Sequence, residues 1–226
     1  MNEALREKPV ILIVVLGLVC IVAAAALGLV YGVTKVRIAG EDQKAKQEAL
    51  RDVLPSAARF DPITTGYDVD GKPFVYYEAY DANNALVGYA FEGHATGYSS
   101  TIELTVGLSP DERTITGIKI SKQQETPGLG AVCVKTGTTK NIWEIFSPAQ
   151  NTENDRGWQG QFTNMALEQV GGQGIPRNVR ALSGATITTN AVLRAVRSAI
   201  WNYHLARGRD PNITMSGATK KGNAEP

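Results

Sequence analysis

Residues 74–121 read FVYYEAYDANNALVGYAFEGHATGYSSTIELTVGLSPDERTITGIKIS. Four runs within this region, at 74–80, 85–94, 101–107 and 114–121, are rich in β-branched and aromatic residues. Turn-forming residues separate them, DANN after the first run and SPDE after the third. Such runs at short intervals predict consecutive strands joined by tight turns, which is the pattern of an antiparallel meander.

A long uncharged segment lies near the N-terminus. Residues 10–33, VILIVVLGLVCIVAAAALGLVYGV, contain 21 hydrophobic residues among 24. A helix of this length is about 36 Å long at ~1.5 Å per residue, enough to cross the core of a bilayer. A secretory signal has a shorter apolar core of about 7–15 residues before a small-residue cleavage site, which the alanines at 23–26 could imitate. The greater length favours an uncleaved anchor.

The charges beside this segment do not decide on which side of the membrane the remainder lies. Arg6 and Lys8 precede it, and four basic residues follow it between positions 35 and 46. Local counting would keep the following domain inside the cell. Long domains, however, translocate largely regardless of such charges, so the count has little weight.

Helical patterns flank the strands. Residues 41–54 are rich in helix formers and end before Pro55, which predicts a helical arm next to the membrane. From 189 to 207 the apolar residues recur at helical spacing, which predicts a helix with one buried stripe: Val192, Ala195, Val196, Ala199, Ile200 and Tyr203. Residues 142–146 predict a short helix, whereas residues 157–174, rich in Gly and Gln, predict surface loops.

These patterns predict an α+β protein in which a transmembrane helix precedes one domain with an antiparallel meander and packed helices. We expect an N-terminal cytoplasmic segment at 1–9 and the transmembrane helix at 10–33. A helical juxtamembrane arm follows at 34–60, then the domain at 61–207 and a flexible tail at 208–226.

Composition limits the chemistry. The net charge is +1, so a nucleic-acid partner is not indicated. The chain has two cysteines, Cys20 in the apolar run and Cys133 far from it, and two histidines, so neither a disulfide framework nor a metal site is predicted. Redox chemistry would therefore require an organic cofactor. Cys133 is most simply a buried, inert thiol.

The residues with the clearest chemical potential precede the last predicted helix, at Ser183-Gly184-Ala185-Thr186. Small residues allow another molecule to approach the backbone, and the free N–H groups of a helix N-terminus attract anions. A phosphate held at Thr186 would suit this position. Ser and Thr before a helix are also ordinary caps, and that interpretation is equally simple. A second copy at 216–219 precedes no predicted helix, so we treat it as a chance match.

A second unusual loop, Glu125-Thr126-Pro127-Gly128-Leu129-Gly130, follows the last predicted strand. Pro-Gly is a turn signal, and the glycines around Leu129 would let a tight loop press an apolar side chain against a flat partner. The loop lacks the Gly-Lys-Ser/Thr ending of a phosphate loop. A purely structural turn is the simpler alternative. Tyr98 could cover the face of a ring, although a core or surface tyrosine is again simpler.

These features together resemble the FMN-binding G subunit of the Rnf ion-translocating electron-transport complex and the related C subunit of the sodium-translocating NADH:quinone oxidoreductase. The resemblance is carried by the anchor, Gly97-Tyr98-Ser99-Ser100 before the strand end Val106-Gly107, the loop at 125–130, and Ser-Gly-Ala-Thr opening the last helix. It extends from the anchor to about Arg207 and leaves only the tail outside.

The resemblance implies a site for covalent FMN. In that family the Thr that closes Ser-Gly-Ala-Thr carries FMN through a phosphoester bond, which a separate flavin transferase forms from FAD. The implied attachment residue here is Thr186. The resemblance places Ser183, Gly184, Ala185 and Thr188 around the phosphate, and Glu125, Thr126, Gly128, Leu129 and Gly130 along the flavin ring.

One residue departs from the family pattern. The family usually has Asp three residues before the Ser, and Arg180 occupies that position here. The missing carboxylate could weaken recognition by the transferase. Alternatively, the guanidinium could pair with the phosphate, which keeps one negative charge as a diester.

The function that the resemblance implies is electron transfer through FMN by one component of an ion-translocating oxidoreductase, with little activity alone and no catalytic side chain. The chain would span the cell inner membrane once, with its domain on the periplasmic or extracytoplasmic side and the other membrane subunits as partners. One alternative is an anchored extracytoplasmic domain that binds a ligand or partner without a redox role. Another is a flavoenzyme that acts alone on a small molecule.

Overall fold

The computed structural model describes residues 9–134, 157–172 and 174–209, and the chain divides into two units, Met1–Lys46 and Gln47–Pro226. The first unit consists of most of helix α1 (Pro9–Val53). The part from Ile11 to Gly32 has a mean hydropathy of 3.0 and exposed side chains, so by length and composition it could cross a membrane. This fits the expected single-pass anchor.

Helix α1 does not stop at the end of the apolar segment. The sequence suggested an anchor and a separate arm, but a single helix continues to Val53. The intervening residues include Lys, Ala, Glu and Gln and no proline, so nothing in them breaks the helix. The helix ends two residues before Pro55, as predicted.

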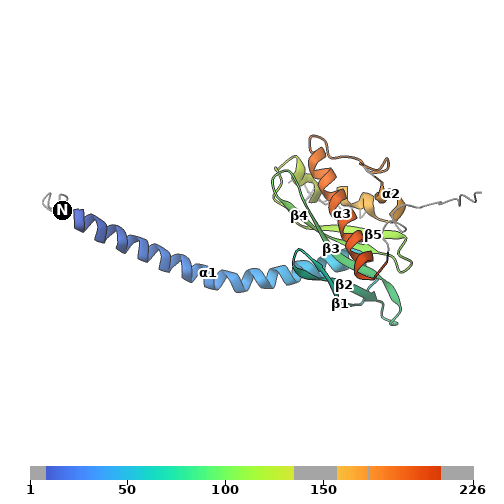
Figure 1. Ribbon diagram of the computed structural model, residues 1–226, viewed down its shortest axis with the longest axis horizontal. Coiled ribbons are helices and arrows are strands. Elements are labelled where there is room, and N and C mark those ends of the chain that lie inside the picture. The colour runs from blue at the N-terminus through green and yellow to red at the C-terminus, as the bar shows by residue number, and fades with distance from the viewer. Residues whose placement is uncertain (1–8, 135–156, 173, 210–226) are drawn as a thin grey trace, which may run out of the picture. The chain divides into compact units, whose positions relative to one another are not determined.

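The second unit is built on an antiparallel sheet whose described strands follow the chain in order (Figure 1). The strands are β1 (Arg59–Val69), β2 (Lys72–Tyr80), β3 (Leu86–Thr96), β4 (Thr101–Leu108), β5 (Thr114–Lys122) and β6 (Met165–Ala166). The middle four confirm the predicted meander to within two residues at each end. Strand β1 was not predicted, because it is an edge strand that contains Pro62 and Gly66, residues that interior strands avoid.

Helix α3 (Thr186–Ala206) covers one face of the sheet, mainly over β3 and β4 (Figure 1). Every residue of the predicted stripe is fully buried: Val192, Ala195, Val196, Ala199, Ile200 and Tyr203. The helix lies close to β3 because Gly93 has no side chain. A Cβ there would lie 2.5 Å from the Ala195 carbonyl oxygen and 2.5 Å from the Ala199 Cβ.

The end of α1 packs on the opposite face of the sheet. Leu50, Val53 and Leu54 form a separate buried cluster with Ala79 of β2 and Ala90 of β3. The Thr116 hydroxyl of β5 donates a hydrogen bond to the Val53 carbonyl at 2.8 Å and satisfies one of the free acceptors of the helix end. The sheet is therefore covered on both faces.

The expectation of surface loops over residues 157–174 is wrong. This part of the chain contains two short helices, η4 (Gly157–Phe162) and α2 (Leu167–Gly171), and strand β6 between them. Phe162 and Val170 are fully buried. The high Gly and Gln content conceals a few widely spaced apolar residues, and one glutamine is structural. Gln159 is buried, and its side-chain oxygen accepts the N–H of Ile120 at 2.7 Å.

Some of the expected elements cannot be compared with the structure. The short helix at 142–146 lies outside the described residues, as do residues 1–8 and all of the tail from 210 onward. The first two tail residues continue the end of α3. The Gly208 N–H donates to the Leu205 carbonyl, and the Arg209 guanidinium pairs with the buried Glu112. A further short helix, η2 (Gly130–Val134), follows the loop after β5.

The close approach of α3 to β3 predicts the effect of a single methyl group. Gly93→Ala should lower the free energy of unfolding by about 1–3 kcal/mol, because the helix must move away from the strand. Gly66→Ala is the matched control, since nothing lies within 4 Å of a Cβ at Gly66. Urea unfolding followed by tryptophan fluorescence measures both variants. Equal stability of the two variants would contradict the packing described here.

Candidate functional site

The Ser-Gly-Ala-Thr segment forms a turn that leads into α3, and Thr186 is the first helical residue. Gly184 has φ +71°, a left-handed conformation that favours glycine. The cap residue is Ala185, which has no side chain able to cap the helix. Thr186 is exposed, and no described residue is hydrogen-bonded to its hydroxyl. The capping interpretation therefore does not account for this residue.

The other two threonines of the first turn are engaged. Thr188 is 1% exposed, and its hydroxyl donates to a Glu125 carboxylate oxygen at 2.6 Å. Thr189 is buried, donates to the Ala185 carbonyl at 3.2 Å, and accepts the Leu182 N–H at 3.0 Å. Among the hydroxyls of the described segment 183–189, those of Ser183 and Thr186 remain exposed.

Glu125 is a buried carboxylate with four hydrogen-bond donors. Besides Thr188, three successive backbone N–H groups of the loop between β3 and β4 donate to it, from Tyr98 at 3.2 Å, Ser99 at 3.0 Å and Ser100 at 3.1 Å. Burial alone would raise the pKa of Glu125, but these donors outweigh it and hold the pKa below the ordinary value. The group is therefore ionised at neutral pH.

Glycines make room for this carboxylate. A Cβ on Gly97 would lie 2.5 Å from one Glu125 oxygen, and a Cβ on Gly130 would lie 2.6 Å from the Thr188 hydroxyl. Three segments distant in sequence thus meet at Glu125: the loop at 97–100, the loop at 125–130 and the first turn of α3. We call this arrangement the Glu125 junction.

The loop at 125–130 turns tightly and presents Leu129 to the Ser-Gly-Ala-Thr turn. The N–H groups of Leu129 and Ala131 both donate to the Thr126 carbonyl at 3.2 Å, and Gly128 has φ +79°. A Cβ on Gly184 would lie 3.1 Å from a methyl carbon of Leu129. Thr126 and Gly128 are exposed beside it. The two motifs singled out in the sequence therefore lie in contact.

Two residues for which the resemblance implied contact with the cofactor have buried side chains. The resemblance placed Glu125 along a flavin ring and Thr188 beside a phosphate, yet these side chains are buried and hydrogen-bonded to each other. Gly130 abuts both of them. Ser183, Gly184, Thr186 and Leu129 remain at the surface, where a ligand can reach them. Ala185 is 7% exposed.

Exposed apolar side chains lie on the segments that meet at Glu125, and one of them was not predicted as a site residue. Outside α1, the large hydrophobic residues exposed in the described chain are Tyr98, Leu129, Ile187 and Trp201. The first three belong to the segments of the Glu125 junction. Exposed apolar residues gathered in this way are typical of binding sites. The sequence could have indicated Ile187, because it is an apolar residue that lies outside the predicted buried stripe of α3.

Arg180 has an exposed side chain and a fixed backbone. Its N–H donates to the Gln161 side-chain oxygen at 2.6 Å, and its carbonyl accepts the Trp158 indole N–H at 2.7 Å. Its guanidinium makes no ion pair with any residue that the structure describes. Both hypotheses about this cation, weaker recognition by a transferase or pairing with a phosphate, stay predictions.

Cys133 is a buried residue close to Glu125. It is fully buried, and burial together with the nearby Glu125 charge raises the pKa of its thiol to about 11. The thiol is thus protonated and enclosed, in agreement with an inert role. The described residues contain no cluster of His, Cys, Asp or Glu that could hold a metal ion.

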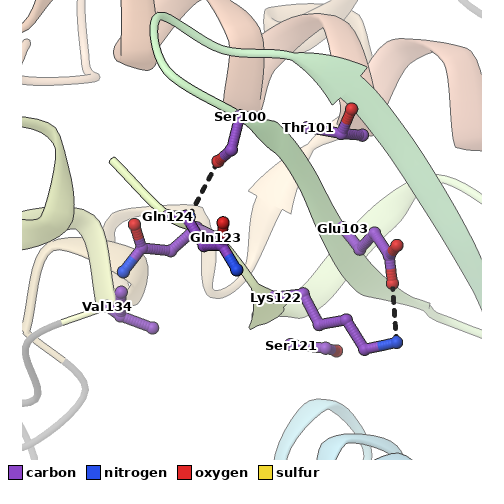
Figure 2. Close-up of a pocket in the computed structure, with 8 residues that line it drawn as sticks. All are labelled: Ser100, Thr101, Glu103, Ser121, Lys122, Gln123, Gln124 and Val134. Atoms are coloured by element: carbon purple, nitrogen blue, oxygen red, sulfur yellow. Dashed lines mark hydrogen bonds and ion pairs between the residues drawn. The ribbon is translucent and has the colours of Figure 1, made fainter. Parts of the chain in front are cut away.

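A pocket of about 490 Å³ is lined by residues of β4, of β5 and of the segments next to them (Figure 2). Its lining includes Ser100, whose hydroxyl accepts the Gln124 N–H at 2.7 Å, and the ion pair between Lys122 and Glu103. Ser100 also donates its N–H to Glu125, so the pocket and the junction share this residue. None of the residues predicted to bind a cofactor lines the pocket.

Comparison with known proteins shows the family to which the site belongs. Residues 97–201 match the family model described as FMN-binding domain, a range that includes every segment of the junction. The chain is 36% identical over 195 residues to the G subunit of the ion-translocating oxidoreductase complex of Methanosarcina acetivorans, covering 83% of this chain and 90% of that protein. It is 32% identical to the G subunit of the Na⁺-translocating ferredoxin:NAD⁺ oxidoreductase complex of Acetobacterium woodii, over 84% and 88% of the two chains.

Among solved structures, the C subunit of the Na⁺-translocating NADH-quinone reductase from Parabacteroides distasonis matches 80% of this chain and 94% of its own, with 17% identity and a TM-score of 0.45. The fold and the site together define an FMN-binding domain behind an apolar N-terminal helix. The chain belongs to the family of the G subunits of ion-translocating oxidoreductase complexes.

The ionised state of Glu125 predicts acid sensitivity. Because its pKa is lower in the folded protein than the ordinary value of 4.5, its contribution to stability is complete above pH 4.5 and is lost as the pH falls through the folded pKa. At pH 7, Glu125→Gln should lower the free energy of unfolding by about 2–4 kcal/mol, because buried donors lose their acceptor.

This difference should shrink as the pH is lowered from 5 toward about 3, since wild type then loses the same charge. Urea unfolding of the detergent-solubilised chain, followed by tryptophan fluorescence, measures it at each pH. A difference that stays constant or grows on acidification would mean that Glu125 is not stabilised as a carboxylate.

Proposed function

We propose that the protein is a membrane-anchored flavoprotein that carries electrons through FMN bound covalently to Thr186, as one component of an ion-translocating oxidoreductase complex. The observation that carries the proposal is that the threonine hydroxyls at the start of α3 differ in burial and in hydrogen bonding. Thr188 and Thr189 are buried and hydrogen-bonded, whereas Thr186 is exposed with no described partner for its hydroxyl. Thr186 is therefore the threonine of this turn that a modifying enzyme can reach.

The environment of Thr186 suits a phosphodiester. The first N–H groups of a helix have no partner within it and carry a partial positive charge, so they stabilise an anion attached at the first turn. Ser183 and the left-handed Gly184 are exposed in the turn before the helix, so a ligand can approach the backbone there. Arg180 supplies an exposed cation a few residues earlier in the chain, without an ion pair among the described residues.

Attachment requires a separate flavin transferase with FAD as donor. The Thr186 oxygen attacks the phosphorus next to riboflavin, a phosphoester bond forms, the pyrophosphate bond breaks, and AMP leaves. The hydroxyl proton passes to a base of the transferase. FMN, when bound, supplies the electron-transfer chemistry, and the protein supplies its position and surroundings.

The protein's own residues then hold and shield the ring. Leu129 lies against Gly184 and is 45% exposed, so it offers an apolar contact next to the attachment residue. Tyr98 and Ile187, 70% and 53% exposed, extend this apolar surface on the neighbouring segments. A planar aromatic ring that covers these side chains would remove them from water and gain the free energy of their burial.

The apolar part of α1 serves in this proposal as an uncleaved anchor in the cell inner membrane, with the domain on the periplasmic or extracytoplasmic side. A covalent bond is useful there, because a cofactor lost to dilute surroundings would not be recovered. The remaining membrane subunits of the complex would deliver and accept the electrons, so the isolated chain should turn over little substrate.

The attachment residue can be tested by coexpression with a flavin transferase. The purified, denatured wild-type chain should fluoresce under ultraviolet light on a gel, and Thr186→Val should abolish the signal because it removes the oxygen while keeping the side-chain shape. Thr186→Ser should retain labelling. Ser198→Ala, which removes an exposed hydroxyl from the same helix, is the matched control and should label as wild type.

Labelling that survives Thr186→Val would assign the modification to another residue, with the exposed Ser183 the first to examine. A wild-type chain without covalent flavin would contradict the proposal and favour a ligand-binding or partner-binding domain without a redox role. Turnover of a small substrate by the isolated chain with a soluble electron donor would instead indicate a flavoenzyme that acts alone.

A further inference from the structure

We infer that Glu125 is a positioning residue for the modification of Thr186, acting through Thr188 rather than through contact with the flavin. The inference rests on the proposed attachment at Thr186. It departs from the role along the flavin ring that the family resemblance implied for Glu125. The observation behind it is the Glu125 junction, where a buried carboxylate holds three separate segments of the site.

A side-chain hydrogen bond, rather than a cap, links the start of α3 to the neighbouring loop. The cap residue of α3 is Ala185, which cannot cap the helix with a side chain. The described bonds of the Thr189 hydroxyl reach only Ala185 and Leu182, in the segment that leads directly into the helix. The bond from the Thr188 hydroxyl to Glu125, at 2.6 Å, is therefore the described side-chain link from this first turn to the neighbouring loops. Thr188 follows Thr186 by two residues, so it fixes the turn that presents the Thr186 hydroxyl.

The same carboxylate also holds the loop between β3 and β4. The other Glu125 bonds hold the backbone of the loop from Tyr98 to Ser100. Tyr98 N–H and the Thr188 hydroxyl bind the same carboxylate oxygen, Oε2. One atom thus sets the distance between the segment that carries Tyr98 and the helical turn that carries Thr186.

Only a side chain that accepts hydrogen bonds at both of its oxygens satisfies the four donors of the junction. All four partners are donors, and an ionised carboxylate accepts at both of its oxygens. In Glu125→Gln one oxygen becomes an NH₂ group. The Thr188 hydroxyl can rotate and accept from it, but the Tyr98 N–H cannot, so at least one donor faces another donor. The variant keeps the size of the side chain and loosens the junction.

The consequence is specific to the chemical step. A transferase can still bind the exposed turn of a loosened site, but the Thr186 oxygen is less often in line with the phosphorus that it attacks. A misplacement of about 1 Å commonly costs up to roughly a hundredfold in rate. We therefore expect Glu125→Gln to lower the kcat of flavin transfer roughly tenfold to a hundredfold, with a KM for the chain within about threefold of wild type.

The experiment uses the purified full-length chain in detergent, produced without flavin, together with a flavin transferase and FAD. Initial rates of covalent labelling are measured against the concentration of the chain at pH 7. Glu103→Gln is the matched control, because Glu103 is a half-exposed carboxylate that pairs with Lys122 outside the junction. It should label with the kcat and KM of wild type.

Variants at Thr188 separate positioning from loss of the fold. Thr188→Val removes the link to the carboxylate and leaves the three backbone donors in place, so its kcat should also fall, whereas Thr188→Ser should restore it. The double variant of Glu125→Gln and Thr188→Val should lose less than the product of the two single effects, because both remove the same link. All rates are taken at a temperature where near-ultraviolet circular dichroism shows the variant folded.

Amide hydrogen exchange of the unlabelled chain provides a readout independent of flavin. Exchange at Tyr98, Ser99 and Ser100 should accelerate in Glu125→Gln and stay unchanged in Glu103→Gln. A wild-type kcat in Glu125→Gln overturns the inference, and so does a wild-type kcat in Thr188→Val, because Glu125 is inferred to act through Thr188. A loss confined to KM overturns it as well. Absence of labelling on wild-type Thr186 would instead contradict the proposed function.

Discussion

The arrangement of the site depends on one buried negative charge. A carboxylate at 5% exposure is costly unless hydrogen bonds satisfy it, and Glu125 is satisfied by donors from two other segments. That requirement draws the loop after β3 and the start of α3 to the loop after β5. It also explains the glycines at 97 and 130, since a Cβ at either position would collide with the carboxylate or its partner.

Helix α3 connects this junction to the rest of the domain. Its buried stripe holds it on β3 and β4, and Gly93 lets it lie close to the sheet. Further along the helix, the Arg194 guanidinium donates to the Thr96 carbonyl at 2.8 Å, next to the loop whose N–H groups bind Glu125. The position of Thr186 is therefore set twice, by packing along the helix and by the carboxylate at its start.

Much of this was predictable from sequence, and the exceptions have physical causes. Runs of β-branched and aromatic residues between turn residues predicted β2 to β5, and helical spacing of apolar residues predicted the buried stripe of α3, because burial selects those patterns directly. Strand β1 escaped because an edge strand tolerates proline and needs little burial. The short helices at 157–171 were not predicted because each buries only two side chains. The pairing of Glu125 with Thr188 joins residues 63 positions apart, and no local pattern encodes such a contact.

The central proposal is that the covalent flavin is attached to the hydroxyl of Thr186, the exposed threonine of this turn. Tandem mass spectrometry of the coexpressed, trypsin-digested protein tests it directly, because cleavage after Arg180 and Arg194 places every hydroxyl of the turn on one peptide. The account predicts that this peptide carries one FMN and that the fragment ions assign it to Thr186. An FMN on Ser183 or Thr188, or an unmodified peptide from protein that retains its flavin, would contradict it.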